Sequence, residues 1–315
     1  MPDKKTLSET DIRTLYINPA LEEAGWEFGK AIAQEYTLSA GRVVLKAGPP
    51  TRAEGRRADY VFFYKPNIVL AVLEAKDNKH TLRSGIQQAL DYAEALDAPF
   101  AFSSNGDGFF FHDRTANPGE PIEQALPMGE FPTPDELIRK YEAWKGLTAA
   151  QQQIVNQPYF SDGTGRRPRY YQQIAINRTV EAIAKGQPRL LLIMATGTGK
   201  TYTAFQIAYL LWKSGAKKRI LFLADRTALI DQTRNGDFRH FGDKLTVLQN
   251  NQRSKAHEIY LALYQGLSNN DEAKSLFRQY SPGFFDLIIV DECHRGSARD
   301  DSAWREILTY FDSAT

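Results

Sequence analysis

Three charged side chains in the first half of the 315-residue chain could together hydrolyse a phosphodiester bond. Asp59 follows a basic run, and Glu74 and Lys76 lie at the end of an apolar segment. Two carboxylates that lie close together repel each other unless a cation lies between them, and hard oxygen ligands favour Mg²⁺. The metal would polarise a phosphate and help to generate hydroxide, while Lys76 orients the water or stabilises charge. These residues predict a catalytic site in which Asp59 and Glu74 bind Mg²⁺.

A hairpin has to bring the two carboxylates together. The sequence predicts neighbouring strands over 58–64 and 68–75. A two-residue turn between them would place Asp59 opposite Glu74. Pro66 can also lengthen this turn and shift the register. Because the spacing arises often by chance, a surface hairpin with scattered charges remains the alternative.

A helix predicted over 82–96 follows the hairpin and adds two polar side chains. Gln88 and Tyr92 are four residues apart, so they share one face of the helix. We expect both to belong to the catalytic site. The alternative for this pair is a solvated polar face.

A glycine-rich loop in the second half could hold phosphates. The loop follows an apolar run over 190–194, which predicts a strand, and it opens a helical stretch. Backbone N–H groups of such a loop turn inward, and the helix N-terminus adds partial positive charge. Lys200 would reach the β- and γ-phosphates, and Thr201 would bind Mg²⁺. The predicted nucleotide-binding residues of the loop are Thr196, Gly197, Thr198, Gly199, Lys200 and Thr201.

An acidic pair further along the chain completes the prediction of a nucleoside triphosphatase. Asp291 and Glu292 directly follow a predicted buried strand over 287–290. Asp291 would lie in the Mg²⁺ shell, and Glu292 would orient or deprotonate the attacking water. An isolated acidic pair is more often a solvated strand end, but the glycine loop earlier in the chain favours the catalytic interpretation.

The two halves differ in their predicted architecture. Strands and helices alternate beyond residue 168, which indicates a parallel sheet flanked by helices. We predict domains over 1–147 and 169–315, joined by a linker over 148–168. The other elements expected in the first half are helices over 8–34 and 135–145, strands over 42–46, 100–103 and 108–112, and an irregular segment over 117–134.

Composition excludes several classes of protein. Lys and Arg total 39 and Asp and Glu total 38, so a net charge of +1 argues against a polycationic nucleic-acid coat. The single cysteine, Cys293, permits no internal disulfide and no thiolate zinc site. No apolar run approaches the ~18 residues of a membrane span, and the start has no signal-peptide pattern. The sequence therefore predicts a soluble, cytoplasmic protein.

The motifs of the second half resemble those of superfamily 2 helicases and translocases. The loop over 195–201 resembles their motif I, which explains Met194 where the general phosphate-loop pattern has glycine. Residues 291–294 resemble the DEAD/DEAH motif II, and 221–232 resemble motif Ia. Residues 169–172 resemble the upstream glutamine motif, in which the amide of Gln172 would read the adenine edge. The resemblance implies ATP as the nucleotide.

The first half resembles the PD-(D/E)xK nuclease core. Asp59 and the Glu74-Ala75-Lys76 sequence match its pattern, although Ala58 stands where the family usually has proline. The Gln88 and Tyr92 pair matches the Gln-x-x-x-Tyr motif of the RecB-like branch. The implied fold class is α/β: a RecB-like PD-(D/E)xK nuclease domain followed by a RecA-like parallel-sheet lobe.

This order of motifs resembles the restriction (motor–nuclease, R) subunit of type I restriction–modification enzymes. Segments 8–26, 56–60 and 260–265 add to the resemblance. It implies a DNA endonuclease that uses Mg²⁺ and ATP, translocates double-stranded DNA, and assembles with modification (methyltransferase) and specificity subunits. Glu9 could assist the nuclease metal site, although an acidic residue at a helix start is the simpler interpretation.

Two other functions stay open at this point. One is a different defence or repair nuclease–helicase, such as a type III-like enzyme, and the other is a non-catalytic module that binds DNA or a partner. Only 23 residues follow Glu292, so we expect an N-terminal fragment that ends near motif III. The motor would then be inactive in this chain, while the nuclease domain could be complete.

Overall fold

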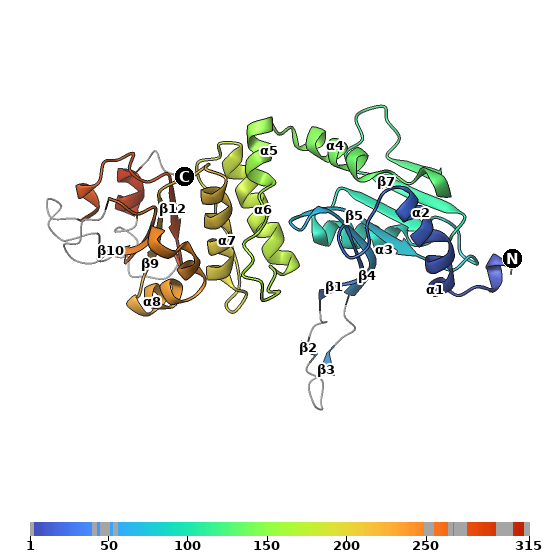
Figure 1. Ribbon diagram of the computed structural model, residues 1–315, viewed down its shortest axis with the longest axis horizontal. Helices are drawn as coiled ribbons and strands as arrows, with labels where there is room; N and C mark the ends of the chain where they lie inside the picture. The colour runs from blue at the N-terminus through green and yellow to red at the C-terminus, as the bar shows by residue number, and fades with distance from the viewer. Residues whose placement is uncertain are drawn as a thin grey trace. The chain divides into compact units, whose positions relative to one another are not determined.

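The structure is a computed structural model that describes residues 3–39, 56–248, 255–263, 267, 276–293 and 305–311, and the backbone of 43–44 and 51–52. The chain divides into two compact units, residues 1–148 and residues 149–315 (Figure 1). Among the described residues, no helix is long and apolar enough to cross a membrane.

The first unit is built on one mixed sheet with the strand order β1-β4-β5-β6-β7-β8. β5 and β6 run parallel and are connected through helix α3 (Ile86–Leu96), whereas the other neighbours are antiparallel. All eight residues of β5 are buried. The strands are β1 (Ile32–Ser39), β4 (Arg56–Lys65), β5 (Ile68–Ala75), β6 (Phe100–Ser104), β7 (Gly108–Asp113) and β8 (Glu123–Pro127), and a separate ribbon pairs β2 (Val43–Val44) with β3 (Thr51–Arg52).

Short helices complete the core of this unit. Helix α1 (Glu9–Ile12) begins with a capping box between Ser8 and Asp11, and helix α4 (Pro134–Lys145) begins with another between Thr133 and Glu136. A π-helical turn η2 (Arg13–Ile17) lies between α1 and α2 (Asn18–Glu23). Pro19 explains this turn, because its ring excludes the usual position of the carbonyl four residues earlier. The shared core contains the buried rings of Trp26, Phe62, Phe102, Phe109 and Phe131.

Two predictions of secondary structure in the first unit are wrong. Helix does not continue to residue 34, because Gly25 takes the left-handed conformation (φ +87°) just after α2 and the chain then turns into β1. The segment expected to be irregular contains β8, which pairs with β7. The sequence did not predict β8, because its side chains are mostly exposed and it lacks an alternating apolar pattern.

Other predictions for the first unit are confirmed. β4 and β5 form the predicted antiparallel hairpin, and the strands predicted over 100–103 and 108–112 are present as β6 and β7. The helices predicted over 82–96 and 135–145 are present as α3 and α4. Of the strand predicted over 42–46, only Val43–Val44 lies among the described residues.

The second unit contains the predicted parallel sheet, with the order β10-β11-β9-β12 and helices packed against it. Helix α5 lies in the segment predicted as a linker and packs against α6 and α7. The elements are α5 (Ala149–Val155), α6 (Tyr170–Ala184), α7 (Lys200–Lys213), β9 (Ile220–Ala224), α8 (Thr227–Asn235), η4 (Asp237–Lys244), β10 (Leu245–Leu248), β11 (Ile259–Leu263), η6 (Leu276–Gln279) and β12 (Leu287–Val290).

The strand predicted over 190–194 is not present. Residues 190–194 carry no strand ladder, and the side chains of Leu191 and Ile193 are 73% and 90% exposed. β12 forms one edge of the described sheet and pairs only with β9 there. An apolar run predicts burial but does not supply a partner strand, and a strand exists only where its backbone groups are paired.

Tyr264, Gln265 and His294, which belong to the motif resemblances, lie outside the described residues.

Candidate functional site

The hairpin of β4 and β5 brings Asp59 and Glu74 together. The ladder pairs Tyr60 with Leu73, which is the register expected from a two-residue turn, although the ladder is irregular between Phe62 and Lys65. One residue further along, Asp59 and Glu74 are in contact. Each carboxylate also accepts a hydrogen bond from the other strand. The Glu74 Oε1 atom accepts from the Asp59 backbone N–H at 3.2 Å, and the Asp59 Oδ2 atom accepts from the Ala75 N–H at 2.8 Å.

Glu74 is a buried acid with a strongly perturbed pKa. Its side chain lies on a fully buried strand and the residue is 1% exposed. Burial, together with the negative charge of Asp59, raises the pKa of Glu74 to about 8. A buried carboxyl that faces a second carboxylate is electrostatically unfavourable in its ionised form. A divalent cation at this position would remove the penalty for both groups.

The lysine of the predicted site is held by the helix that follows the hairpin. Lys76 Nζ donates to Gln88 Oε1 at 3.3 Å, and Gln88 Nε2 donates to the Tyr92 hydroxyl at 3.4 Å. The guanidinium of Arg56 lies 5.2 Å from the centre of the Tyr92 ring. The structure thus brings Lys76, Gln88 and Tyr92 into one row, which begins beside the two carboxylates and ends at a basic side chain.

Gly85, which the sequence analysis did not single out, allows this row to form. Gly85 precedes α3 and packs against β5 and β6. A methyl group at this position would lie 3.2 Å from the Cβ atoms of Glu74 and Ser103 and 3.3 Å from the Glu74 carbonyl oxygen. Only glycine permits α3 to begin this close to Glu74. The signal available in the sequence was a glycine just before a helix, which is too common to interpret alone.

We expect Gly85→Ala to weaken any activity of this site without unfolding the protein. The added methyl group would push α3 away from β5 and lengthen the contact between Gln88 and Lys76, at a cost of about 1–3 kcal/mol in stability. Plasmid nicking should fall roughly tenfold, the equivalent of ~1.4 kcal/mol. Gly129→Ala is the matched control, because nothing lies within 4 Å of a Cβ atom there. Equal nicking by both variants would contradict this packing argument.

A second group of residues beside Asp59 was also missed by the sequence analysis. Arg13 Nη1 lies 3.6 Å from Asp59 Oδ1 and forms an ion pair with Glu35, while Arg13 Nε donates to the Tyr60 hydroxyl at 3.1 Å. Glu35 also pairs with Arg57 Nε at 2.8 Å. Arg13 and Glu35 lie far from the motif in sequence, so no spacing pointed to them.

Glu9 contributes to the electrostatics of the same site. Burial raises the pKa of the Glu9 carboxyl, and the charge of Asp59 raises it further, whereas Lys76 and Arg13 lower it. Glu9 and Arg13 lie one helical turn apart and thus on the same side of the chain. Among the described residues, no group of three or more His, Cys, Asp or Glu side chains is arranged to bind a metal ion. Asp59 and Glu74, which the sequence predicts as metal ligands, lie in contact through the hydrogen bond from the Asp59 N–H to Glu74 Oε1.

The glycine loop of the second unit leads directly into helix α7. Thr198 Oγ1 and the Thr198 N–H donate to the Ala195 carbonyl at 2.6 and 3.4 Å, which closes the turn. Gly197 and Gly199 take left-handed conformations (φ +76° and +83°). Thr196 lies exposed in the turn, and Thr201 lies in the first turn of α7.

Gln172 is attached to this loop. Its Nε2 atom donates to the Thr198 carbonyl at 2.8 Å, and its Oε1 atom accepts from the Arg169 N–H at 2.8 Å. The side chain is buried and lies against Gly199, where a Cβ atom would come within 2.5 Å of the amide nitrogen. The side chain of Gln172 is therefore joined to the glycine loop by a hydrogen bond to the loop's backbone.

The lysine of the loop and the acidic pair meet in the same unit. Lys200 Nζ binds Glu292 Oε1 at 2.7 Å, across 92 residues of sequence. Burial and the neighbouring charge of Glu292 raise the pKa of Asp291, which accepts a hydrogen bond from the Glu292 N–H at 2.9 Å. Glu292 has a left-handed backbone (φ 51°), an unusual conformation that places its carboxylate on Lys200. A cation and two carboxylates thus gather beside the loop.

Comparisons with known proteins match both halves of the chain. Residues 32–120 match the family described as "Type I restriction enzyme R protein N terminus", and residues 166–315 match that described as "Type III restriction enzyme, res subunit". The chain is 53% identical over 309 residues to the type I restriction enzyme EcoAI endonuclease subunit of Escherichia coli, and it covers 38% of that protein. It is 29% identical to the EcoKI endonuclease subunit of E. coli strain K12 and covers 32% of it.

A solved structure agrees with these matches. A fragment of an HsdR subunit of a type I restriction enzyme from Vibrio vulnificus YJ016 is 40% identical, with a TM-score of 0.81 over 98% of this chain and 54% of that one. The chain thus spans about a third of the length of its curated relatives. Because the similarity extends over 98% of the chain, the protein belongs to the family of type I restriction enzyme R subunits.

Proposed function

We propose that the first unit is a Mg²⁺-dependent DNA endonuclease domain of the RecB-like PD-(D/E)xK type. The observation that carries this proposal is the pairing of Asp59 and Glu74 across β4 and β5, with Lys76 held beside them by Gln88. A buried carboxyl with a raised pKa, that of Glu74, beside a second carboxylate, that of Asp59, suits a hard cation that keeps open positions for water and phosphate.

The residues of this chain would have distinct roles in phosphodiester hydrolysis. Asp59 and Glu74 hold the metal, and the metal supplies Lewis-acid polarisation of the phosphate when bound. Lys76 orients the attacking water and offsets the negative charge that develops on the phosphate. Gln88 fixes the ammonium group of Lys76, and Tyr92 fixes the amide of Gln88. Catalytic residues would thus include Asp59, Glu74, Lys76, Gln88 and Tyr92.

We propose that the second unit binds Mg²⁺ and ATP as the first lobe of a motor. Thr196, Gly197, Thr198 and Gly199 would cradle the phosphates together with the N-terminus of α7. Lys200 would contact the β- and γ-phosphates, Thr201 and Asp291 would hold Mg²⁺, and Glu292 would act on the attacking water. Gln172, on α6, would read the adenine edge with the amide that in this structure binds the Thr198 carbonyl and the Arg169 N–H.

In the whole protein, nuclease and motor would serve one restriction complex. We infer a cytoplasmic type I R subunit that translocates double-stranded DNA and assembles with modification and specificity subunits. Support for type I rather than a type III-like enzyme comes from the N-terminal family match and from similarity over 98% of the chain. The nuclease domain would comprise 1–147, followed by a linker over 148–168 and the motor lobe over 169–315.

Plasmid nicking tests the assignment of the nuclease to the first unit. Supercoiled plasmid is incubated with the chain in Mg²⁺ or Mn²⁺ without ATP, beside Lys76→Ala and Lys200→Ala. We expect nicking by the parent chain and by Lys200→Ala, and a loss of at least 100-fold in Lys76→Ala, because general catalytic groups contribute roughly 10²–10⁴-fold.

Two results would contradict the proposal. Equal nicking by the parent chain and Lys76→Ala would place the activity elsewhere or in a contaminant. No nicking by any folded version, even after addition of modification and specificity subunits, a recognition-site plasmid and ATP, would favour the non-catalytic module. The fold of each variant is checked by circular dichroism.

A further inference from the structure

Arg13 is a buried cation next to the predicted metal site. Its side chain is 14% exposed, and its guanidinium lies 4.8 Å from the centre of the Tyr60 ring. Burial by itself would lower the pKa of Arg13, but the hydrogen bonds to Glu35 and Tyr60 raise it, so the charge is retained. The Tyr60 hydroxyl in turn donates to Asn18 Oδ1 at 2.8 Å, which anchors the aromatic ring.

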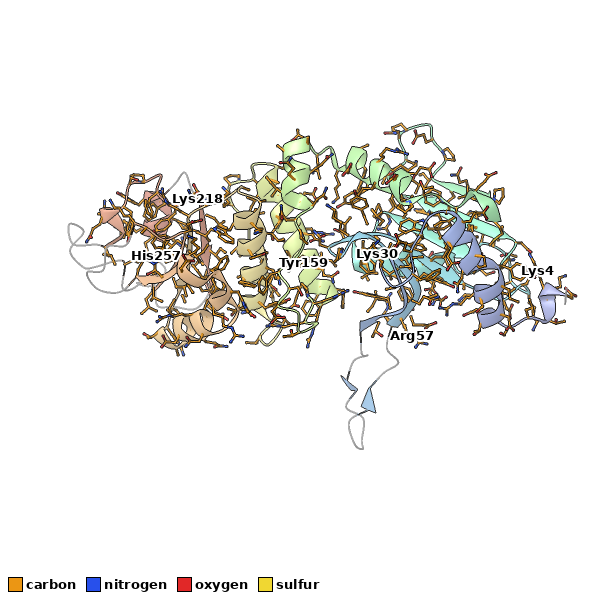
Figure 2. The ribbon with its side chains drawn as sticks, viewed as in Figure 1. Lys4, Lys30, Arg57, Tyr159, Lys218 and His257 are labelled. Atoms are coloured by element: carbon orange, nitrogen blue, oxygen red, sulfur yellow. The ribbon has the colours of Figure 1, made fainter. Side chains whose placement is uncertain are left out.

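Glu35 holds this cation in place at a conformational cost. Its backbone has φ 53° within strand β1, a conformation that non-glycine residues rarely adopt. The strained position places the carboxylate between two guanidiniums, those of Arg13 and Arg57. Arg57, which is labelled in Figure 2, lies near the end of the β1–β4 ladder, opposite Thr37. Its side chain is 62% exposed. Charges therefore alternate in the order Arg57, Glu35, Arg13, Asp59.

Arg13 lies beside one of the two carboxylate oxygen atoms of Asp59. The Oδ2 atom of Asp59 is engaged by the Ala75 N–H, whereas Oδ1 lies 3.6 Å from Arg13 Nη1. A divalent cation bound through Oδ1 would share that oxygen with the guanidinium and would be repelled by its charge. The repulsion is strong because the surroundings are largely shielded from water.

We propose that Arg13 is a resident cation that keeps metal affinity low until DNA is bound. This proposal rests on the proposed nuclease function. In the absence of DNA, Arg13 and the metal compete for the charge of Asp59. A phosphodiester group entering the site adds a negative charge that both cations can share, so metal and DNA strengthen each other's binding. Arg13 is thus a positioning residue that acts through Asp59 and makes metal loading depend on the substrate.

Metal binding without DNA or nucleotide tests this role independently of cleavage. Free Mn²⁺ is measured by electron paramagnetic resonance during titration of the whole chain. Arg13→Gln should bind Mn²⁺ at least fivefold more tightly than the parent chain, and Arg13→Lys should resemble the parent because it keeps the charge. Glu35→Gln should bind more weakly, because Arg13 then loses its other carboxylate partner. A merely structural role of Arg13 would weaken binding in all three variants.

A matched control separates the effect of a charge beside Asp59 from the effect of the net charge of the unit. Arg83 pairs with Glu123 in the same unit, and its side chain is 64% exposed. Arg83→Gln removes the same charge and should leave Mn²⁺ affinity unchanged within twofold. Native circular dichroism is required of every variant. If Arg13→Gln fails to fold, Arg13→Lys decides the question: Mn²⁺ affinity like that of the parent chain supports the role of the charge, and weaker binding contradicts it.

DNA coupling is measured in a Lys76→Ala background, so that the duplex is not cut. Duplex DNA should tighten Mn²⁺ binding several-fold in this background and by less than twofold when Arg13→Gln is added. Unchanged or weaker Mn²⁺ binding by folded Arg13→Gln would overturn the role of Arg13. If Glu74→Gln leaves the Mn²⁺ titration of the parent chain unaltered, the nuclease site itself is misassigned, which is a different failure.

Discussion

Glu74→Gln is expected to stabilise the metal-free first unit at pH 8 while abolishing DNA cleavage. The pKa of Glu74 is raised from 4.5 to about 8, mainly because the carboxyl is buried and secondly because it faces Asp59. Below pH 4.5 the carboxyl is protonated in both the folded and the unfolded state, so it carries no penalty. As the pH rises from 4.5 through 8, the unfolded state loses its proton first, and stability falls. Glutamine is uncharged throughout and escapes this loss.

The size of the effect follows from the shift in pKa. Each pKa unit corresponds to about 1.4 kcal/mol, so the loss for the parent chain between pH 4.5 and 8 is a few kcal/mol. Hydrogen exchange of peptides from β4 and β5, in EDTA at pH values from 5 to 8, measures the local unfolding free energy after correction for intrinsic exchange. The parent chain should become less protected as the pH rises, and Glu74→Gln should not.

An exposed glutamate on the same unit serves as the control for this experiment. Glu94, on the exposed side of α3, provides the control, and Glu94→Gln should follow the parent chain. Addition of Mg²⁺ at pH 8 should restore protection to the parent chain but not to Glu74→Gln, because the amide is a poor ligand. A parent chain whose β4–β5 protection is independent of pH would show that Glu74 does not carry the predicted charge penalty.

Lys200→Ala and Glu292→Gln should change nucleotide affinity in opposite directions. Lys200 is occupied by Glu292 in this structure, so an incoming triphosphate has to displace that carboxylate. Loss of the ammonium group should weaken binding of a fluorescent ATP analogue by about 10–150-fold, since a hydrogen bond to a charged group contributes roughly 1.5–3 kcal/mol. Glu292→Gln removes the competitor and should tighten binding several-fold, while any hydrolysis is lost.

Equilibrium binding of the fluorescent ATP analogue in Mg²⁺, followed by fluorescence anisotropy, measures both changes in affinity. Lys213→Ala, at the exposed C-terminal end of α7, removes a lysine from the same helix and should bind like the parent chain. Weaker binding by Glu292→Gln would mean that the Lys200–Glu292 pair orders the loop rather than competes with the nucleotide.

Local patterns in the sequence were sufficient where neighbouring residues determine the geometry. The turn between the two strands predicted that Asp59 and Glu74 lie together, and they do, although the ladder between the turn and the site is irregular. Helical spacing alone aligns Gln88 with Tyr92, whose side chains are in contact. The alternation of strands and helices correctly predicted the parallel sheet of the second unit, because a parallel pair needs a crossover connection.

Contacts between distant segments could not be predicted in this way. An apolar run at 190–194 predicted a strand, yet strand formation depends on a partner elsewhere in the chain, and the described residues supply none. The close packing of Gly85 on Glu74, and the pairing of Lys200 with Glu292, likewise depend on how separate elements meet.

The sequence by itself therefore determined which side chains are the candidates for the chemistry of each site: the acidic pair and lysine of the first unit, and the glycine loop and acidic pair of the second. Only the tertiary structure decided their electrostatic surroundings, because burial and charge are summed over all neighbours in space. Arg13 and Glu35 illustrate the difference: Arg13, on a π-helical turn, lies beside Asp59, and Glu35, a strained strand residue, binds Arg13. No pattern of spacing in the sequence indicates either contact.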